Sequence, residues 1–511
     1  MELSRRTFIE AAGAAAMAGV AAPAVAAPAV AQAEEAAIEP VETIDCDVVI
    51  VGAGLSGLCA CVEAGHQGLN TVCVEGMSVT GGGAGMGVEG SFGIESSLTK
   101  AMDLHVDPRE VYAVEMKNSQ WRADGACWMD FMYQSGTNID WLIEQGVMFE
   151  PTVDDYHGKD FNTFHWYKDG SCGVGFVPPM TAKAEELGVQ FLFETLGKKL
   201  IQDESGKVCG LYAQRKEDGS YVQINAKAVI LASGGFGSNK ELVSQIGYPI
   251  DQLDCMFEFA TGDGYLMATE VGAHSMMGVT ADQSGSYFPD YMKGMDNIMW
   301  AVAPQLLWVN EDAARFFPED NSIVCLSNSN APKLAQKAHY ALWDTAMMKD
   351  YTERNCITGN YIGDIIDDAI AQGGQGLYRA DSVEELAGCV GLDPDKLRAT
   401  VDTYNDMCAA GDDTEFGKDP QWMLPFSEPP YYLAVPGWIV YVICGAIGTN
   451  RNCQAVTDAK DPIPGLYAIG VDGVMLYRNV YTIGTPGSCS GWCIYSGRKA
   501  VQHAVETYTN A

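Results

Sequence analysis

Six consecutive residues near the N-terminus have the types and spacing needed to bind a pyrophosphate. The run 52–57 reads Gly-Ala-Gly-Leu-Ser-Gly, with glycine at its first, third and sixth positions. Gly52 permits a tight turn, Gly54 lets the backbone approach a phosphate closely, and Gly57 lets the following helix pack against a strand. Together with Ala53, these glycines predict a turn that contacts a dinucleotide.

The elements around this turn are those needed to position it. The apolar run 45–51 has the character of a strand, 58–65 that of a helix, and 71–74 that of a second strand. Glu75 follows the turn by about 20 residues, where a carboxylate can accept hydrogen bonds from the ribose hydroxyls of an adenosine. This order predicts a Rossmann-type unit with the phosphates at the helix N-terminus.

A second glycine-rich run follows the acid and narrows the choice of dinucleotide. Residues 81–87 read Gly-Gly-Gly-Ala-Gly-Met-Gly. Their backbone amides would add donors for a pyrophosphate, and the loop would close on the flavin side. Nicotinamide-dependent dehydrogenases have no need of such a loop, so FAD is favoured over NAD. We expect cofactor contacts from Gly82, Gly83, Ala84 and Gly85.

Composition limits the class of protein. A length of 511 residues predicts two domains or one elaborated α/β domain. Hydrophobic residues at 47% and charged residues at 19% are typical of a globular chain. The net charge of −36 is unfavourable for binding phosphates and argues against nucleic acid as a partner. This acidity keeps a protein soluble, and it could also steer a basic partner toward the surface.

The sixteen cysteines are scattered, and no C-x-x-C or haem-attachment motif occurs among them. Cysteines within apolar runs are typical of buried free thiols. We therefore predict no metal site, although an iron–sulfur cluster held by distant cysteines stays open as an alternative.

The N-terminus has the pattern of an export signal. Residues 4–9 read Ser-Arg-Arg-Thr-Phe-Ile ahead of an alanine-rich run, and small-residue cleavage sites follow at 24–26 and 31–33. The run is interrupted by proline and too weakly apolar to span a membrane. We expect residues 1–33 to be a twin-arginine (Tat) signal that engages the Tat translocase. The mature protein would then be periplasmic or otherwise outside the cytoplasmic membrane.

Further motifs make the chain resemble a known flavoprotein family. They are A-V-I-L-A-S-G-G-F-G, T-G-D-G-Y, W-V-N-E-D-A-A-R-F, P-I-P-G-L-Y-A and S-G-R, at 228–237, 261–265, 308–316, 462–468 and 496–498. In this order the chain is similar to the FAD-dependent fumarate reductase and succinate dehydrogenase flavoproteins, in particular their exported soluble reductase branch.

The resemblance implies an α/β fold with a Rossmann-type FAD-binding domain in two segments, 42–285 and 442–505. It implies an inserted α+β capping domain over 286–441, with the substrate between flavin and cap. Further cofactor contacts are expected from Asp263, Asp472, Gly487 and Ser488.

Three departures from the family argue against fumarate as the substrate. The segment 283–287, where the family usually has a histidine, reads Gln-Ser-Gly-Ser-Tyr. Glu319 is present, but position 323, where the family has its proton-donating arginine, is isoleucine. The segment 441–445 also lacks the family's histidine. A dicarboxylate would lose its charge partners, and an unpaired buried charge is costly.

Three residues are candidates for catalysis. Tyr481 begins a Tyr-x4-Pro-Gly loop that resembles relatives acting on other unsaturated compounds or 3-oxosteroids, and its phenol could donate a proton or polarise a carbonyl. Arg478 could hold an acidic group of the substrate, and Tyr287 could form part of an aromatic wall. The alternatives are core packing or a turn hydrogen bond for Tyr481, a surface position for Arg478 and core packing for Tyr287.

The function expected from these features is an exported reductase that transfers hydride from flavin N5 to an activated C=C bond. The substrate would be an enoate, an enone or a phenolic acrylate, less charged than fumarate. Electrons would come from a separate cytochrome or quinol-linked donor. Two alternatives stay open: a dehydrogenase that introduces a C=C bond, as 3-ketosteroid dehydrogenases do, and a flavin electron carrier without substrate chemistry.

Overall fold

A mixed sheet built from both ends of the chain forms the centre of the fold. The structure is a computed structural model that describes residues 38–83, 87–156, 160–248, 253–255, 257–277, 279–283, 300, 303–323, 326–355, 361–373, 376–474, 476–477, 480–481 and 484–509. The strands of this sheet are β1 (Pro40–Val51), β2 (Thr71–Val74), β6 (Gln190–Leu192), β7 (Thr195–Gln202), β8 (Val208–Arg215), β9 (Tyr221–Leu231), β17 (Gln454–Val456) and β18 (Pro462–Ala468). Their order is β17-β18-β9-β1-β2-β6, and β8 and β7 extend the sheet from β9.

The predicted Rossmann-type unit is present at the middle of this sheet. Strand β1 pairs in parallel with β2 and β9, and helix α2 (Leu55–His66) connects β1 to β2. Val48, Val49 and Ile50 are fully buried, as expected for a central parallel strand that is covered on both faces. Strand β18 pairs in parallel with β9, so the C-terminal segment returns to the same sheet. The predicted α/β fold with a Rossmann-type unit is confirmed.

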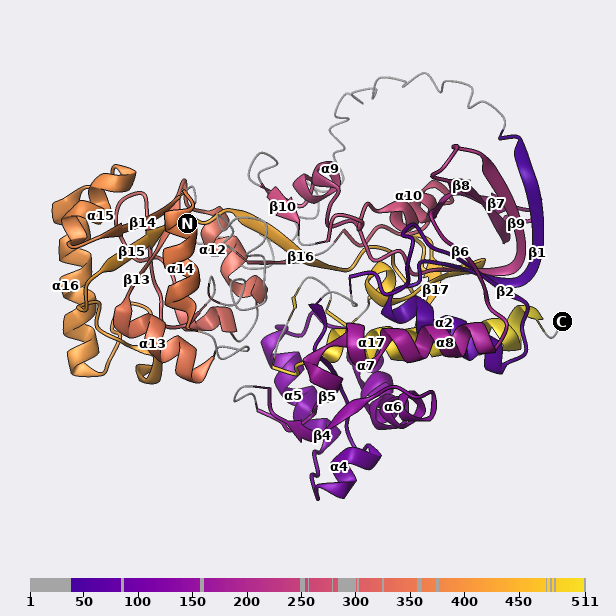
Figure 1. The fold of residues 1–511 in the computed structure, drawn as a ribbon, viewed down its shortest axis with the longest axis horizontal. Helices are drawn as coiled ribbons and strands as arrows, with labels where there is room; N and C mark the ends of the chain where they lie inside the picture. The colour runs from indigo at the N-terminus through magenta and orange to yellow at the C-terminus, as the bar shows by residue number, and fades with distance from the viewer. Residues whose placement is uncertain are drawn as a thin grey trace, which may run out of the picture. The chain divides into compact units, whose positions relative to one another are not determined.

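Helix α2 packs closely against its neighbours because glycines remove side chains at the contacts. Figure 1 shows α2 running beside α8 (Val177–Glu186) and α17 (Ser488–Ala504). A Cβ on Gly57 would lie 1.9 Å from the carbonyl oxygen of Gly52, and one on Gly497 would lie 2.6 Å from that of Ser56. No side chain fits at such distances, so glycine is required at both positions.

A small antiparallel sheet and several helices lie beside this region of the fold. The sheet has the order β3 (Gly90–Phe92), β5 (Phe164–Tyr167), β4 (Phe149–Asp154). The longer helices are α5 (Pro108–Asn118) and α6 (Gly125–Glu144). Shorter ones are α4 (Ser97–Ala101), α7 (Cys172–Gly175), α9 (Lys240–Ser244), α10 (Asp263–Glu270) and α12 (Asn330–Leu334).

The segment expected to form the cap has a hydrophobic core of its own. Its antiparallel sheet has the order β12 (Leu307–Asn310), β13 (His339–Asp344), β15 (Tyr431–Ala434), β14 (Leu377–Ala380). The helices α13 (Thr345–Arg354), α14 (Ile362–Ala371), α15 (Val383–Val390) and α16 (Pro394–Ala410) lie around it (Figure 1). All buried members of this core fall between residues 300 and 433. The boundaries of the capping domain stay a prediction.

A third sheet crosses the expected domain boundary. Strand β16 (Trp438–Cys444) pairs in parallel with β10 (Leu253–Cys255) and antiparallel with β11 (Val279–Gln283). The boundary between residues 441 and 442 therefore lies inside a continuous strand. Within the described ranges, no helix combines the length and the apolar character that a bilayer crossing requires.

We predict that Gly57→Ala destabilises the fold by about 1–3 kcal/mol and lowers FAD content, because its Cβ would overlap the Gly52 carbonyl. Gly388→Ala in helix α15 is the matched control, since a Cβ there has no neighbour within 4 Å. It should be neutral or stabilise the protein by up to about 1 kcal/mol. Thermal unfolding and flavin absorbance measure both effects. Equal stability of the two variants would contradict the close packing of α2.

Candidate active site

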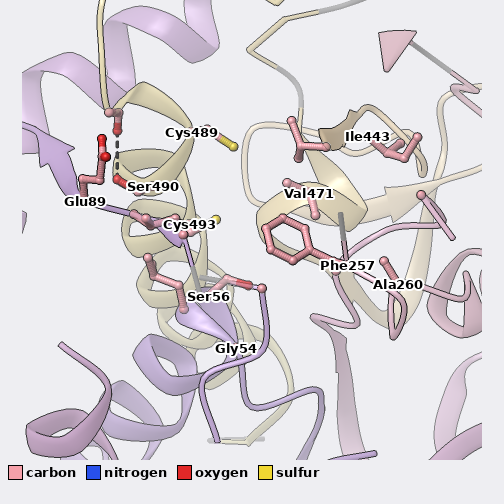
Figure 2. A pocket seen from close by; sticks show the side chains of 18 of the residues that line it. Gly54, Ser56, Glu89, Phe257, Ala260, Ile443, Val471, Cys489, Ser490 and Cys493 are labelled. Carbon is pink, nitrogen blue, oxygen red and sulfur yellow. Dashed lines mark hydrogen bonds between the residues drawn. The ribbon is translucent and has the colours of Figure 1, made fainter. Parts of the chain in front are cut away.

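A cavity of about 240 Å³ lies where the two glycine loops, β16 and the start of α17 come together. Figure 2 shows two walls facing each other across it. One wall carries Glu89 together with Ser490 and Cys493 of α17, and the other carries Ile443, Val471 and Phe257. The cavity therefore joins segments that are more than 400 residues apart in the sequence.

The first glycine turn lies against the end of β9 and the second glycine loop. Gly52 has φ +107°, and a Cβ there would lie 2.3 Å from the carbonyl oxygen of Ala232. The amide of Gly81 donates to the carbonyl oxygen of Ala53 at 2.9 Å. A Cβ on Gly82 would lie 3.3 Å from Cα of Gly54. The two loops expected from the sequence are thus in direct contact.

The cavity has room for a phosphate or flavin atom at two glycines. Gly54, at the N-terminus of α2, lines the cavity, and a Cβ there would have only the Gly81 carbonyl within 4 Å, at 3.8 Å. Gly234 also lines it, has φ +89°, and a Cβ there would meet nothing within 4 Å. Side chains at these positions would fill the space that a cofactor needs. Gly83 and Gly87 of the second loop line the same cavity. These residues fit a dinucleotide.

Glu75 supports the first turn from the end of β2. Its Oε2 accepts a hydrogen bond from the amide of Ala53, and its Oε1 accepts one from the amide of Met77, both at 2.7 Å. Burial raises the pKa of the Glu75 carboxyl above its usual range. A carboxylate keeps further lone pairs after two such bonds, so it can still accept from a ribose hydroxyl as expected.

Asp472 ties the C-terminal segment to the end of β9. It is fully buried, its Oδ1 accepts from the amide of Gly235 at 2.8 Å, and its Oδ2 accepts from the hydroxyl of Ser233 at 2.9 Å. The amide of Ser233 also donates to Oδ2. Burial raises the pKa of Asp472. The structure therefore places this carboxylate on the backbone that forms the cavity wall, where it acts as a positioning residue.

Asp263 lies at the start of α10, among residues that do not line the cavity. Its Oδ1 accepts from Lys198 Nζ at 2.8 Å, and its Oδ2 accepts from the hydroxyl of Thr261 at 2.6 Å. The next residue, Gly264, donates its amide to the Ser233 hydroxyl at 3.1 Å. Direct contact of Asp263 with the cofactor stays a prediction.

Tyr481 lines the cavity from the loop that precedes α17. Its ring packs edge-on against Tyr477, with ring centroids 4.8 Å apart. The Tyr477 hydroxyl shares a hydrogen bond of 2.7 Å with Ser488 Oγ, and burial raises the pKa of Tyr477 well above its usual range. Gly487 lines the cavity with φ +75° at the N-cap of α17, where a Cβ would lie 2.7 Å from the amide nitrogen of Phe92. The structure places Tyr481 and Gly487 on the lining of the cavity. Ser488 is the next residue after Gly487 and bonds to Tyr477.

Four expected site residues lie outside the described part of the chain: Ala84, Gly85, Tyr287 and Arg478. Their predicted roles stay predictions.

Glu319 has structural partners inside the cap. Arg315 donates to Glu319 Oε2 at 3.0 Å and to Asp413 Oδ2 at 2.9 Å, and Lys418 Nζ lies 3.4 Å from Glu319 Oε2. Burial raises the pKa of Glu319, but Lys418 and Arg315 outweigh this effect and hold it below its usual range. All four side chains are almost completely buried. Their charges stabilise one another in the cap.

The cavity contains residues that the motifs did not identify. These are Glu89, Tyr156, Phe164, Phe257, Phe259, Val440, Val442, Ile443, Cys489 and Cys493. A hydrogen bond with Cys489, followed by burial, raises the pKa of the Cys493 thiol well above its usual range, so this thiol is neutral. The described cysteines carry free thiols, and all but Cys389 are buried or half-buried. Among the described residues, no three His, Cys, Asp or Glu side chains gather as metal ligands.

Comparison with known proteins decides the cofactor. A family model described as an FAD binding domain, of the FAD_binding_2 type, matches residues 47–484. The chain belongs to this family. Its cofactor is FAD, and the two glycine loops are placed to hold the dinucleotide.

Relatives of this FAD-binding family member indicate its class of reaction. The chain is 29% identical to the vinyl phenol reductase of Lactiplantibacillus plantarum, over 91% of this chain and 97% of that protein. It is 28% identical to the urocanate reductase of Eggerthella lenta, over 84% of this chain and 70% of that protein. Its fold matches a flavocytochrome c3 fumarate reductase with a TM-score of 0.70 at 23% identity, over 99% of this chain and 82% of that one. The chain is an FAD-dependent oxidoreductase that acts on CH–CH groups.

We expect Glu75→Gln to weaken FAD binding by about ten- to hundredfold, because a neutral amide replaces the acceptor for the ribose hydroxyls. In the wild type the FAD affinity should fall as the pH decreases from neutral toward the raised pKa of Glu75, since the protonated carboxyl is the poorer acceptor. Flavin fluorescence titration at several pH values measures both effects. If FAD affinity depended on pH in Glu75→Gln as it does in the wild type, the assignment of Glu75 to the ribose hydroxyls would be contradicted.

Asp472→Asn should lower the free energy of unfolding by about 1–3 kcal/mol, because an amide group would face backbone donors that need an acceptor. It should also lower FAD content, since Ser233 and Gly235 adjoin the cavity wall at Gly234. Chemical denaturation and the flavin-to-protein ratio report the two effects. Asp458→Asn, at an exposed acid, is the control and should change neither.

Proposed function

We propose that this chain is an exported, FAD-dependent reductase of an activated C=C bond in a small aromatic substrate that is less charged than fumarate. The observation that carries the proposal is the chemistry of the cavity wall. The described lining residues include no Lys, Arg or His, whereas Tyr156, Phe164, Phe257, Phe259 and Tyr481 supply aromatic rings. A dicarboxylate would have no cation to pair with among these residues.

The match to the vinyl phenol reductase supports an aromatic, phenolic substrate. The vinyl phenol reductase aligns with nearly the full length of both chains, and its name describes reduction of a vinyl group on a phenol ring. Apolar and aromatic walls stabilise a neutral ring by burial and by edge or stacked contacts. We therefore favour a phenolic alkene over an aliphatic acid.

The chain's own residues would bind and orient the substrate and supply a proton. Bound FAD supplies hydride chemistry at its N5. Tyr481 lines the cavity, and its phenol can donate a proton or a hydrogen bond to the reacting substrate. The Tyr477–Ser488 hydrogen bond holds the ring against which Tyr481 packs.

An anaerobic screen with viologen-reduced enzyme tests the reaction. Phenolic acrylates, 4-vinylphenol, enones and fumarate are offered, and reoxidation of the flavin is followed by absorbance. We expect phenolic alkenes to reoxidise the flavin and fumarate to leave it reduced. Reoxidation by fumarate alone would overturn the proposed substrate class. If the oxidised enzyme instead introduced a C=C bond into a saturated compound, and its flavin had a high midpoint potential, the dehydrogenase alternative would be favoured.

Tyr481→Phe should lower kcat by about 10²–10⁴-fold with little change in FAD content, because it removes one hydroxyl and keeps the ring. Tyr133→Phe, at an exposed tyrosine on α6, is the matched control and should keep full activity. Single-turnover flavin reoxidation measures the chemical step. If Tyr481→Phe reoxidised as fast as the wild type, another group would have to donate the proton.

Export and electron supply complete the proposal. The Arg5-Arg6 pair and the alanine-rich leader support Tat export, and the net charge of −36 supports a docking surface for a basic cytochrome or quinol-linked donor. Replacing both arginines by lysine should retain the protein in the cytoplasm, as measured by fractionation. Electron transfer from the donor should slow with rising salt. A rate independent of salt would count against electrostatic docking.

A further inference from the structure

Glu89 carries the only carboxylate among the described residues that line the cavity. The hydroxyl of Tyr156 donates to its Oε2 at 2.7 Å, and Tyr156 lines the cavity too. Figure 2 shows Glu89 on the same wall as Ser490, across from Ile443 and Phe257. A hydrogen bond from a ligand donor to such a carboxylate is stronger than one to a neutral acceptor.

The backbone around Glu89 is fixed to the reacting end of the cavity. The carbonyl oxygen of Glu89 accepts from the amide of Tyr167 at 2.9 Å, and that of Gly90 accepts from Ser490 Oγ at 2.7 Å. Two residues later, the amide of Phe92 donates to the carbonyl oxygen of Gly487 at 3.1 Å. Strand β3 is therefore bonded directly to helix α17 and to Gly487, at the end of the loop that contains Tyr481.

An aromatic wall stands beside this carboxylate. Asp154 orients it, because its Oδ1 accepts from the amide of Tyr156 at 3.0 Å and its Oδ2 accepts from Trp166 Nε1 at 2.8 Å. The ring of Phe164 lies 4.4 Å from that of Tyr156 and 4.7 Å from that of Trp166, measured between centroids. Phe164 and Tyr156 both line the cavity. The wall thus offers ring surface next to a strong acceptor.

We propose that Glu89, oriented by Tyr156, accepts the hydrogen bond of a phenolic hydroxyl on the substrate and selects for phenols. This inference rests on the proposed reductase function. A carboxylate has about four lone-pair sites, so it can accept the hydroxyl of a ligand together with other donors such as Tyr156. A phenol can donate to it, an aryl methyl ether cannot, and a carboxylate at the same end of the substrate is repelled. Glu89 is thereby a specificity-determining residue.

Paired substrates test this assignment in the reduced holoenzyme. The ratio of kcat/KM for 4-vinylphenol to that for 4-methoxystyrene is measured in the wild type and in Glu89→Gln, Tyr156→Phe and Glu95→Gln. We expect Glu89→Gln to lower the ratio by roughly ten- to hundredfold, as expected for loss of a hydrogen bond to a charged acceptor. Tyr156→Phe should lower it less, because the carboxylate remains. Glu95→Gln, an exposed acid on the same segment, should keep the wild-type ratio.

A binding measurement separates this inference from the reductase proposal. Titration of the oxidised holoenzyme with 4-ethylphenol and its methyl ether, followed by the flavin difference spectrum, requires no turnover. Tighter binding of the phenol in the wild type, lost in Glu89→Gln, supports the assignment even if no alkene is reduced. The assignment to Glu89 is overturned if the wild type reduces phenolic alkenes while Glu89→Gln changes neither the kcat/KM ratio nor the binding preference for the phenol over its methyl ether. FAD content of each variant reports whether the fold is retained.

Discussion

The site depends most on one buried carboxylate, that of Asp472. It accepts hydrogen bonds from the backbone of Ser233 and Gly235, at the point where the chain leaves β9. These bonds hold the C-terminal segment beside a strand more than 200 residues earlier in the sequence. Strand β18 then pairs with β9, and the chain continues into the Tyr481 loop and helix α17. This contact holds Val471 and Gly234, which both line the cavity, beside each other.

The same arrangement supports the proposed neutral, aromatic substrate. Its phosphate-binding part is made of glycine backbone, and its other walls are mainly apolar and aromatic. The ionic residues that resemble the fumarate reductase pattern, Arg315 and Glu319, are bonded to each other inside the cap. Among the described residues that line the cavity, Glu89 is the only Asp, Glu, Lys, Arg or His. An acceptor in an apolar cavity suits a hydroxyl group better than an anion.

The sequence predicts the FAD end of the site well because its signals are local. The turn 52–57, Glu75 and the loop 81–87 lie within 40 residues, and spacing alone defines their geometry. The family resemblance supplied Tyr481 and the C-terminal return. The Glu89–Tyr156 pair could not be found in this way, because antiparallel pairing of β5 with both β3 and β4 creates it and no motif marks these pairings. The one feature of the sequence that pointed to this pair was an acid, Glu89, two residues after the second glycine loop.

Particular contacts also refine the expected organisation. Strand β16 runs through the predicted boundary at 441/442, so the cap and the FAD-binding segments share a strand. Asp263 bonds to Lys198, a residue on the neighbouring strand β7 that no motif connects with it. Such side-chain partners depend on sheet register, which composition and spacing do not specify.

Anaerobic reoxidation of the viologen-reduced holoenzyme by 4-vinylphenol tests the central claim most directly. We predict rapid return of the oxidised flavin spectrum with formation of 4-ethylphenol, and no reoxidation by fumarate. Rapid reoxidation by fumarate, with the phenolic alkene inert, would contradict it.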